Sequence, residues 1–190
     1  LMVEDAHGVG VMGKKGQGTC EQYGVMDDVD LVMTTFSKAF ASLGGFVVGD
    51  SKVIQYIKHL SRPLIFSASI TPAAIGSAGK ALEIIQNEPW RRERLWEITN
   101  VMNRELIKMG YNTGNTETPI IPVFIRDYEK TFMLWHFLRD YGIFTNPVIA
   151  PAVPPEDSLI RTSYTAIHSD EDLEVILKGF HEGGKALGII

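Results

Sequence analysis

DLVMTTFSKAFASLGGFVVG, residues 30–49, is the stretch that decides the fold. Short apolar runs at its two ends are bounded by glycine and acidic residues, which is typical of buried strands in an α/β sheet. The loop between them carries one lysine, Lys38. A solvated lysine usually lies in a charged stretch, whereas a lysine that reacts as a neutral amine needs apolar neighbours, here Phe36 and Phe40. We therefore predict a reactive amine at Lys38, against the alternative of a lysine extending from a surface loop.

A second polar cluster follows the apolar run Leu1-Met2-Val3. Glu4-Asp5-Ala6-His7 comes at the end of this predicted strand, and open α/β sheets bind ligands beyond the carboxyl ends of their strands. A carboxylate there can keep a pyridinium nitrogen protonated, which makes such a ring an electron sink. His7 can hydrogen-bond a phenolic oxygen, although taken alone it is more simply a turn histidine. Asp5 should point to the opposite face of the strand, which leaves Glu4 for the ring.

The next segment contains two nucleotide-binding patterns. Gly8-Val9-Gly10-Val11-Met12-Gly13 matches the dinucleotide pattern G-x-G-x-x-G, but that pattern must run into a helix, and the next five residues have too many glycines to begin one. A phosphate loop is excluded because Lys15 stands where a magnesium-binding serine or threonine is required. We predict instead a flexible glycine loop whose residues need positive φ angles.

Helices and strands alternate along the rest of the chain. Helices are predicted over 51–60 with Ser51 as cap, from Thr71-Pro72 onward, and over 89–109, 128–141 and 170–187; strands are predicted over 119–125, 143–149 and 159–165. This pattern predicts an α/β domain over residues 1–90 and a small α+β domain over residues 91–190. Because the sequence opens directly on an expected buried strand, we expect a fragment.

Composition narrows the class of protein. A formal net charge of -5, with 45% hydrophobic and 22% charged residues, gives no electrostatic reason to expect nucleic acid as a partner, so small molecules are expected. The single cysteine, Cys20, cannot form an intrachain disulfide and fits a reducing compartment, for which we predict the cytoplasm. The apolar stretches are short and interrupted by charge, so we expect no membrane span. No residue is assigned to a metal.

Several motifs together resemble one family. EDAHGVG at 4–10, TFSKAFASLGG at 35–45 and FSASITPA at 66–73 are similar to the α-oxoamine synthases, which use pyridoxal 5'-phosphate (PLP). The similarity continues through IRTS at 160–163 and so covers essentially the whole chain. It implies an α/β fold: the second half of a PLP fold-type-I large domain, mostly parallel sheet with flanking helices, followed by a small C-terminal α+β domain.

The resemblance also implies roles for residues of the segments at 4–10 and 35–45. Lys38 would be the Schiff-base lysine and the base that removes the α-proton of the amino acid. His7 would contact the phenolic oxygen of the cofactor, and Thr35 its phosphate or oxygen edge. The family has aspartate at the position of Glu4, and the extra methylene of glutamate would push the carboxylate into the ring unless the strand shifts.

Further residues extend the implied site. Ser67 and Ser69 match a segment that reaches the phosphate of the neighbouring subunit, which implies a homodimer with shared active sites. Arg161 matches the arginine that binds the substrate carboxylate, a task suited to a bidentate guanidinium; without the family, a surface ion pair is the simpler reading. A histidine that stacks on the ring and a glycine-rich phosphate turn belong to the front half of the family, so this chain alone is expected to be inactive.

The expected activity is the condensation of an amino acid with an acyl-CoA to give an aminoketone, usually with decarboxylation. The sequence does not determine which amino acid or acyl group is used. A PLP-dependent aminotransferase of the same fold is one alternative, and a non-catalytic fragment is another.

Overall fold

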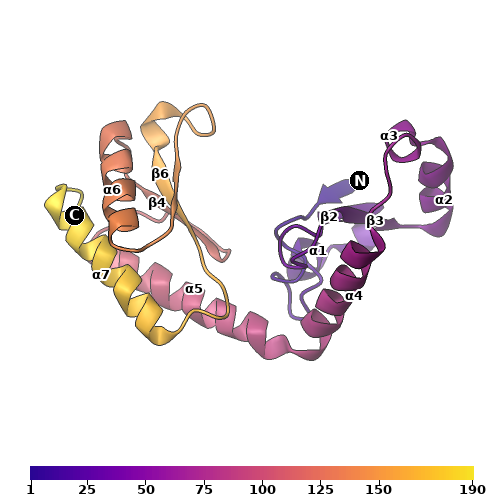
Figure 1. Ribbon diagram of the computed structural model, residues 1–190, viewed down its shortest axis with the longest axis horizontal. Helices are drawn as coiled ribbons and strands as arrows, with labels where there is room; N and C mark the ends of the chain where they lie inside the picture. Colours follow the sequence, from indigo (N-terminus) through magenta and orange to yellow (C-terminus); the bar gives the residue numbers. More distant parts are fainter. The chain divides into compact units, whose positions relative to one another are not determined.

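The computed structural model describes residues 1–190, which form two compact units, Leu1–Arg92 and Glu93–Ile190 (Figure 1). This division falls close to the boundary predicted at residue 90. No helix combines the length and the apolar character needed to cross a membrane. Each unit has its own three-stranded sheet.

The first unit is built on a three-stranded sheet in the order β1 (Met2–Glu4), β2 (Leu31–Thr35) and β3 (Gly45–Gly49). β1 and β2 are parallel, whereas β2 and β3 are antiparallel, with Thr35 opposite Gly45. The short loop from 36 to 44 allows only a hairpin, because a parallel partner requires a long crossover connection. The mostly parallel arrangement that the resemblance implies is therefore seen in one of the two pairings.

Helices surround this sheet. They are α1 (Thr19–Tyr23), the 3₁₀ turn η1 (Met26–Asp28), α2 (Ser51–Leu60), α3 (Arg62–Ile65) and α4 (Pro72–Asn87). The N-cap of α2 is Asp50, whose carboxylate accepts from the Lys52 N–H at 2.8 Å, so the prediction that Ser51 is the cap was wrong by one residue. Thr71 caps α4, the helix that was predicted from Thr71-Pro72 onward.

The second unit continues from α5 (Pro89–Met109), whose first residues belong to the first unit. Its other elements are β4 (Ile120–Phe124), α6 (Tyr128–Asp140), β5 (Asn146–Val148), the 3₁₀ turn η2 (Pro155–Asp157), β6 (Leu159–Ser163) and α7 (Asp170–Ala186). The strands form an antiparallel sheet in the order β4-β6-β5. This is the small α+β domain that the sequence predicts.

One face of this sheet makes the core. Ile121, Val123 and Ile160 are fully buried against the three helices, while the residues between them in sequence face the other way, as the period of a strand requires. The fully buried residues of α5 are Ile98, Met102 and Leu106, whose helical spacing places them on one inward face. The opposite face of the sheet is left without a helix and carries the pocket described below.

A buried hydrogen bond links Tyr111, which follows α5, to helix α7. The Tyr111 hydroxyl donates to the Phe180 carbonyl of α7 at 2.7 Å, and burial raises the pKa of that hydroxyl well above its usual value. Gly184 makes the approach possible, because a Cβ there would lie 2.2 Å from the Tyr111 oxygen. Tyr111 therefore stays protonated and fixes α7 against the rest of the unit.

Candidate active site

Lys38 lies at the tip of the hairpin between β2 and β3. The Phe36 N–H donates to Gly44 O at 2.8 Å, the Ser42 N–H donates to Phe36 O at 2.7 Å, and the Ala41 N–H closes the tip on Lys38 O at 2.9 Å. Ala41 has a φ of 47°, which residues with a Cβ rarely adopt, so the hydrogen bonds hold a strained tip in place. The Lys38 side chain is exposed, and its amine is accessible to a ligand.

The aromatic residues around this loop do not surround the amine. Phe36 and Phe40 are buried, and their rings pack 5.4 Å apart, each also against the ring of Phe46. Together with Ala78 of α4 they form the small core of the first unit. The prediction that Phe36 and Phe40 desolvate Lys38 is therefore wrong within this chain, because both rings are used for packing.

Thr35 stands at the base of the hairpin. Its hydroxyl donates to Gly44 O at 3.0 Å, accepts from the Ser37 N–H at 3.2 Å and lies 2.9 Å from the Ser37 hydroxyl. A threonine hydroxyl has one proton, so Thr35 would have to release Gly44 O to donate to a phosphate. In this structure Thr35 holds the loop that carries Lys38.

Glu4 and Asp5 point to opposite sides of the chain at the end of β1. Glu4 is exposed, and its carboxylate accepts from the Ala6 N–H at 2.8 Å, while Asp5 is only 5% exposed. The alternation predicted for these two carboxylates is confirmed. Because β1 and β2 are parallel, the loop with Glu4 and the exposed His7 leaves the same edge of the sheet as the loop with Lys38.

Ser67 and Ser69 follow α3 in an exposed segment. The Ser67 hydroxyl donates to the Pro63 carbonyl. The neighbouring Phe66 is 80% exposed, which is unusual for a ring of this size. Both serines therefore lie at the surface of the first unit.

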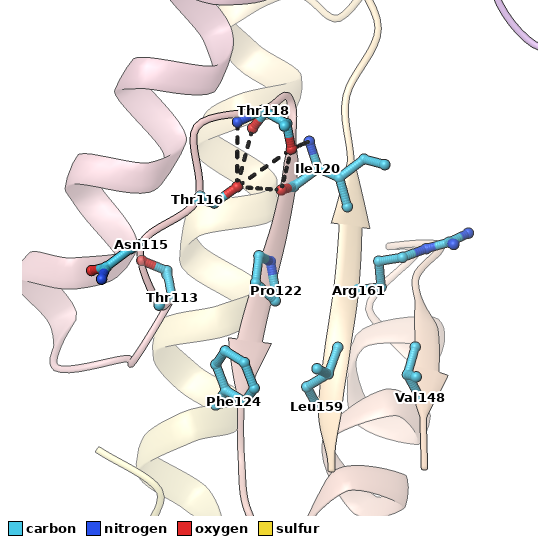
Figure 2. A pocket seen from close by; sticks show the side chains of 11 residues that line it. Thr113, Asn115, Thr116, Thr118, Ile120, Pro122, Phe124, Val148, Leu159 and Arg161 are labelled. Carbon is cyan, nitrogen blue, oxygen red and sulfur yellow. Dashed lines mark hydrogen bonds between the residues drawn. The ribbon is translucent and has the colours of Figure 1, made fainter. Parts of the chain in front are cut away.

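Arg161 belongs to the second unit, on β6, where it pairs with Pro122 of β4 and Asn146 of β5. Figure 2 shows its side chain extending from the sheet face that the helices leave uncovered. It is exposed and has no carboxylate or carbonyl partner, whereas Arg94 and Arg139 of the same unit each contact an aspartate. Arg161 therefore does not form the surface ion pair that was the alternative interpretation of its sequence position.

A pocket of about 500 Å³ adjoins Arg161 (Figure 2). Its floor is apolar, made by Pro122, Phe124, Val148 and Leu159. The segment from Thr113 to Thr118 forms its rim, in which the Thr116 hydroxyl donates to Ile120 O at 2.8 Å. The volume is in the range of small-molecule sites, and one free cation beside an apolar floor suits a ligand that has both an anionic and an apolar part.

Comparison with known proteins decides the family. The family described as aminotransferase class I and II matches residues 1–180. The chain belongs to this family. Within the aminotransferase class I and II family, the matches include the α-oxoamine synthases that the motifs resemble, and the predicted fold-type-I fragment is confirmed.

Three relatives illustrate the match. A serine palmitoyltransferase of Sphingobacterium spiritivorum is 51% identical over 186 residues, 96% of this chain and 47% of its own. An 8-amino-7-oxononanoate synthase of Petrotoga mobilis is 38% identical over 190 residues, 100% of this chain and 48% of its own. A solved structure described as SPT with PLP internal aldimine has a TM-score of 0.95 and 32% identity, covering 100% of this chain and 48% of that one. This chain thus spans about half the length of the relatives it matches.

Two features of this family member were missed by sequence reasoning. One is the hydrogen bonding of the Asp5 carboxylate, which accepts from both the N–H and the hydroxyl of Thr19. The sequence signal for it was the presence of glycines at positions 8 and 18, which leave room for this carboxylate. The other is the threonine-rich rim of the pocket, for which the sequence carries no signal, since its approach to Arg161 depends on the pairing of β4 with β6.

Proposed function

We propose that the protein to which this chain belongs is a PLP-dependent acyltransferase that condenses an amino acid with an acyl-CoA to give an aminoketone, usually with decarboxylation. The observation that carries the proposal is the position of Lys38, an exposed amine on a tight hairpin at the sheet edge where Glu4 and His7 emerge. Because relatives at 51% and 47% identity are named serine palmitoyltransferase, serine and a long-chain acyl-CoA are the first substrates to test.

The side chains at this edge fit PLP. An accessible amine can carry the cofactor covalently, an exposed carboxylate can pair with the ring nitrogen, and His7 can donate to the phenolic oxygen. When bound, PLP supplies a protonated ring that withdraws electrons from the α-carbon of the amino acid. Lys38 then serves as the base that takes the α-proton, and Glu4 keeps the ring nitrogen protonated.

The remaining residues would orient the ligands. Thr35 contacts the phosphate once its hydroxyl turns from Gly44 O, and Ser67 and Ser69 contact the phosphate of a neighbouring subunit in a homodimer with shared sites. The exposed side chains of Phe66 and Tyr56, 80% and 67% accessible, support burial of this surface against a second copy. A cytoplasmic location is supported by Cys20, which is a free thiol.

Substitutions at Glu4 test the carboxylate. Glu4→Gln in the full-length protein is expected to lower kcat by about 10²-fold, because an amide cannot keep the ring nitrogen protonated. Glu4→Asp is expected to retain or raise kcat, since the shorter side chain removes the methylene that crowds the ring. Glu83→Gln, which changes an exposed glutamate on α4, is the control. Equal kcat values for Glu4→Gln and Glu83→Gln would contradict the role of Glu4.

Arg161→Lys tests binding of the substrate carboxylate. The KM for the amino acid is expected to rise about 10-fold to 100-fold, because an ammonium cannot make the two-pronged contact of a guanidinium. Cofactor affinity should change little. Arg104→Lys serves as the control, since Arg104 pairs with Glu105 on an exposed part of the same unit. Equal losses of amino-acid and cofactor binding would show that Arg161 has another role.

The decisive assay is release of CoA by the full-length protein. Mixing it with PLP, one of serine, glycine or alanine, and acyl-CoAs of different length is expected to give free thiol in step with an aminoketone. The aminotransferase class I and II family suggests a second function, because an aminotransferase would exchange an amino group with a keto acid without needing CoA. Amino-group exchange without CoA release would favour that second function, and neither reaction would favour a non-catalytic protein.

A further inference from the structure

A buried carboxylate lies directly behind the edge that carries Glu4 and His7. Asp5 is 5% exposed, and its two oxygens accept from the Thr19 N–H at 2.7 Å and from the Thr19 hydroxyl at 2.5 Å. A buried charge that keeps both oxygens hydrogen-bonded is costly to disturb, because any replacement leaves a donor without a partner. Asp5 thus ties the start of α1 to the end of β1.

The main chain of Asp5 forms the turn that presents His7. Its carbonyl accepts from the Gly8 N–H at 3.2 Å, so Ala6 and His7 are the two central residues of a β-turn. The same carbonyl also accepts from the Thr34 hydroxyl at 3.1 Å. The direction in which His7 leaves the sheet edge is therefore set by a residue that is fixed on both its side chain and its main chain.

The glycine-rich segment makes room for this carboxylate. A Cβ at Gly8 would lie 2.0 Å from Asp5 Oδ1, and a Cβ at Gly18 would lie 2.1 Å from Asp5 Oδ2. Gly18 also has a φ of 104°, which favours glycine. The packing of the Asp5 carboxylate against Gly8 and Gly18 therefore explains why both positions are glycine.

We propose that Asp5, held by Thr19, is the positioning residue that aims His7 at the phenolic oxygen of the cofactor. This inference rests on the proposed function, because it requires PLP at the sheet edge. Asp5 itself touches no ligand: its carboxylate faces Thr19, on the opposite side of the chain from Glu4. Its effect on the cofactor passes through the turn that contains His7.

The test uses the full-length protein with PLP and records the pH at which the visible absorption band of the bound cofactor titrates, together with the melting temperature. Asp5→Asn and Thr19→Val are expected to move that pH in the same direction as His7→Phe, by about 0.5 to 1 pH unit, the effect of one hydrogen bond on a pKa. Thr19→Ser, which keeps the hydroxyl, should titrate like the wild type. In the double variant Asp5→Asn with His7→Phe, no further shift beyond that of His7→Phe is expected.

Asp50→Asn is the matched control, because it also changes a carboxylate that accepts from a helix N–H in the first unit, at α2. It should leave the titration where it is in the wild type and change the melting temperature little, because an asparagine oxygen can still accept from the Lys52 N–H. The proposal is overturned if Asp5→Asn and Thr19→Val behave like Asp50→Asn, or if the shifts of Asp5→Asn and His7→Phe simply add. Should Asp5→Asn fail to fold, Thr19→Val alone decides. Absence of a visible band in the wild type would instead refute the proposed function, and this inference with it.

Discussion

Lys38→Ala in the full-length protein is expected to lower kcat for CoA release by about 10³-fold or more, because it removes both the covalent attachment of the cofactor and the base that takes the α-proton. The hydrogen bonds that shape the hairpin come from backbone groups and from Thr35, so the loop should keep its form without the lysine side chain. Cofactor should still bind non-covalently, with a changed spectrum. Steady-state CoA release and the absorbance spectrum measure the two effects.

Lys80→Ala is the control for this substitution. Lys80 is an exposed lysine of the same unit whose amine pairs with Glu83 on the surface of α4, and such pairs contribute little. Its kcat and spectrum should match those of the wild type. If Lys38→Ala released CoA as fast as Lys80→Ala does, Lys38 would not be the reactive amine.

Phe180→Ala is expected to cause the largest loss of stability. Phe180 is fully buried, and its ring packs edge-on against that of Tyr111 with centroids 5.7 Å apart. Removing the ring leaves a cavity at the centre of the second unit, which should lower the free energy of unfolding by about 3 to 5 kcal/mol. Calorimetry of the full-length protein should show a lower melting temperature for the transition of this unit.

Phe144→Ala provides the comparison for Phe180→Ala. The two substitutions delete the same ring in the same unit, but Phe144 is 91% exposed. Its loss should change the free energy of unfolding by no more than about 0.5 kcal/mol. Similar melting temperatures for the two variants would mean that Phe180 is not part of the core of the second unit.

Most helices and strands were predictable from the sequence, and the strand predicted over 143–149 was not well bounded. The helix at 89–109 was predicted within its observed bounds, because its apolar spacing and its initial proline act locally. The strand predicted over 143–149 is shorter, β5 at Asn146–Val148. Ile143 is apolar for another reason: it packs on α7, where a Cβ at Gly179 would lie 2.3 Å from its Cδ1. An apolar residue of the core outside any strand has the same sequence signal as a strand residue.

Some features of the candidate site were also predictable from the sequence, and others were not. The opposite directions of Glu4 and Asp5 follow from the period of a strand and were predicted correctly. The environment of Lys38 was predicted wrongly, because Phe36 and Phe40 pack against α4. This contact joins segments that are far apart in the chain. The hydrogen bonds of Asp5 were also not predicted, because Thr19 reaches its carboxylate only after the intervening loop folds back.

Borohydride reduction of the full-length protein with PLP, followed by peptide mapping by mass spectrometry, tests the central claim most directly. Reduction should fix the cofactor onto the peptide that contains Lys38, and the visible band should disappear at the same time. Lys52 and Lys80, which lie in the same unit, should remain unmodified. A label on another lysine, or no label at all on a protein incubated with the cofactor, would contradict the claim that Lys38 carries PLP.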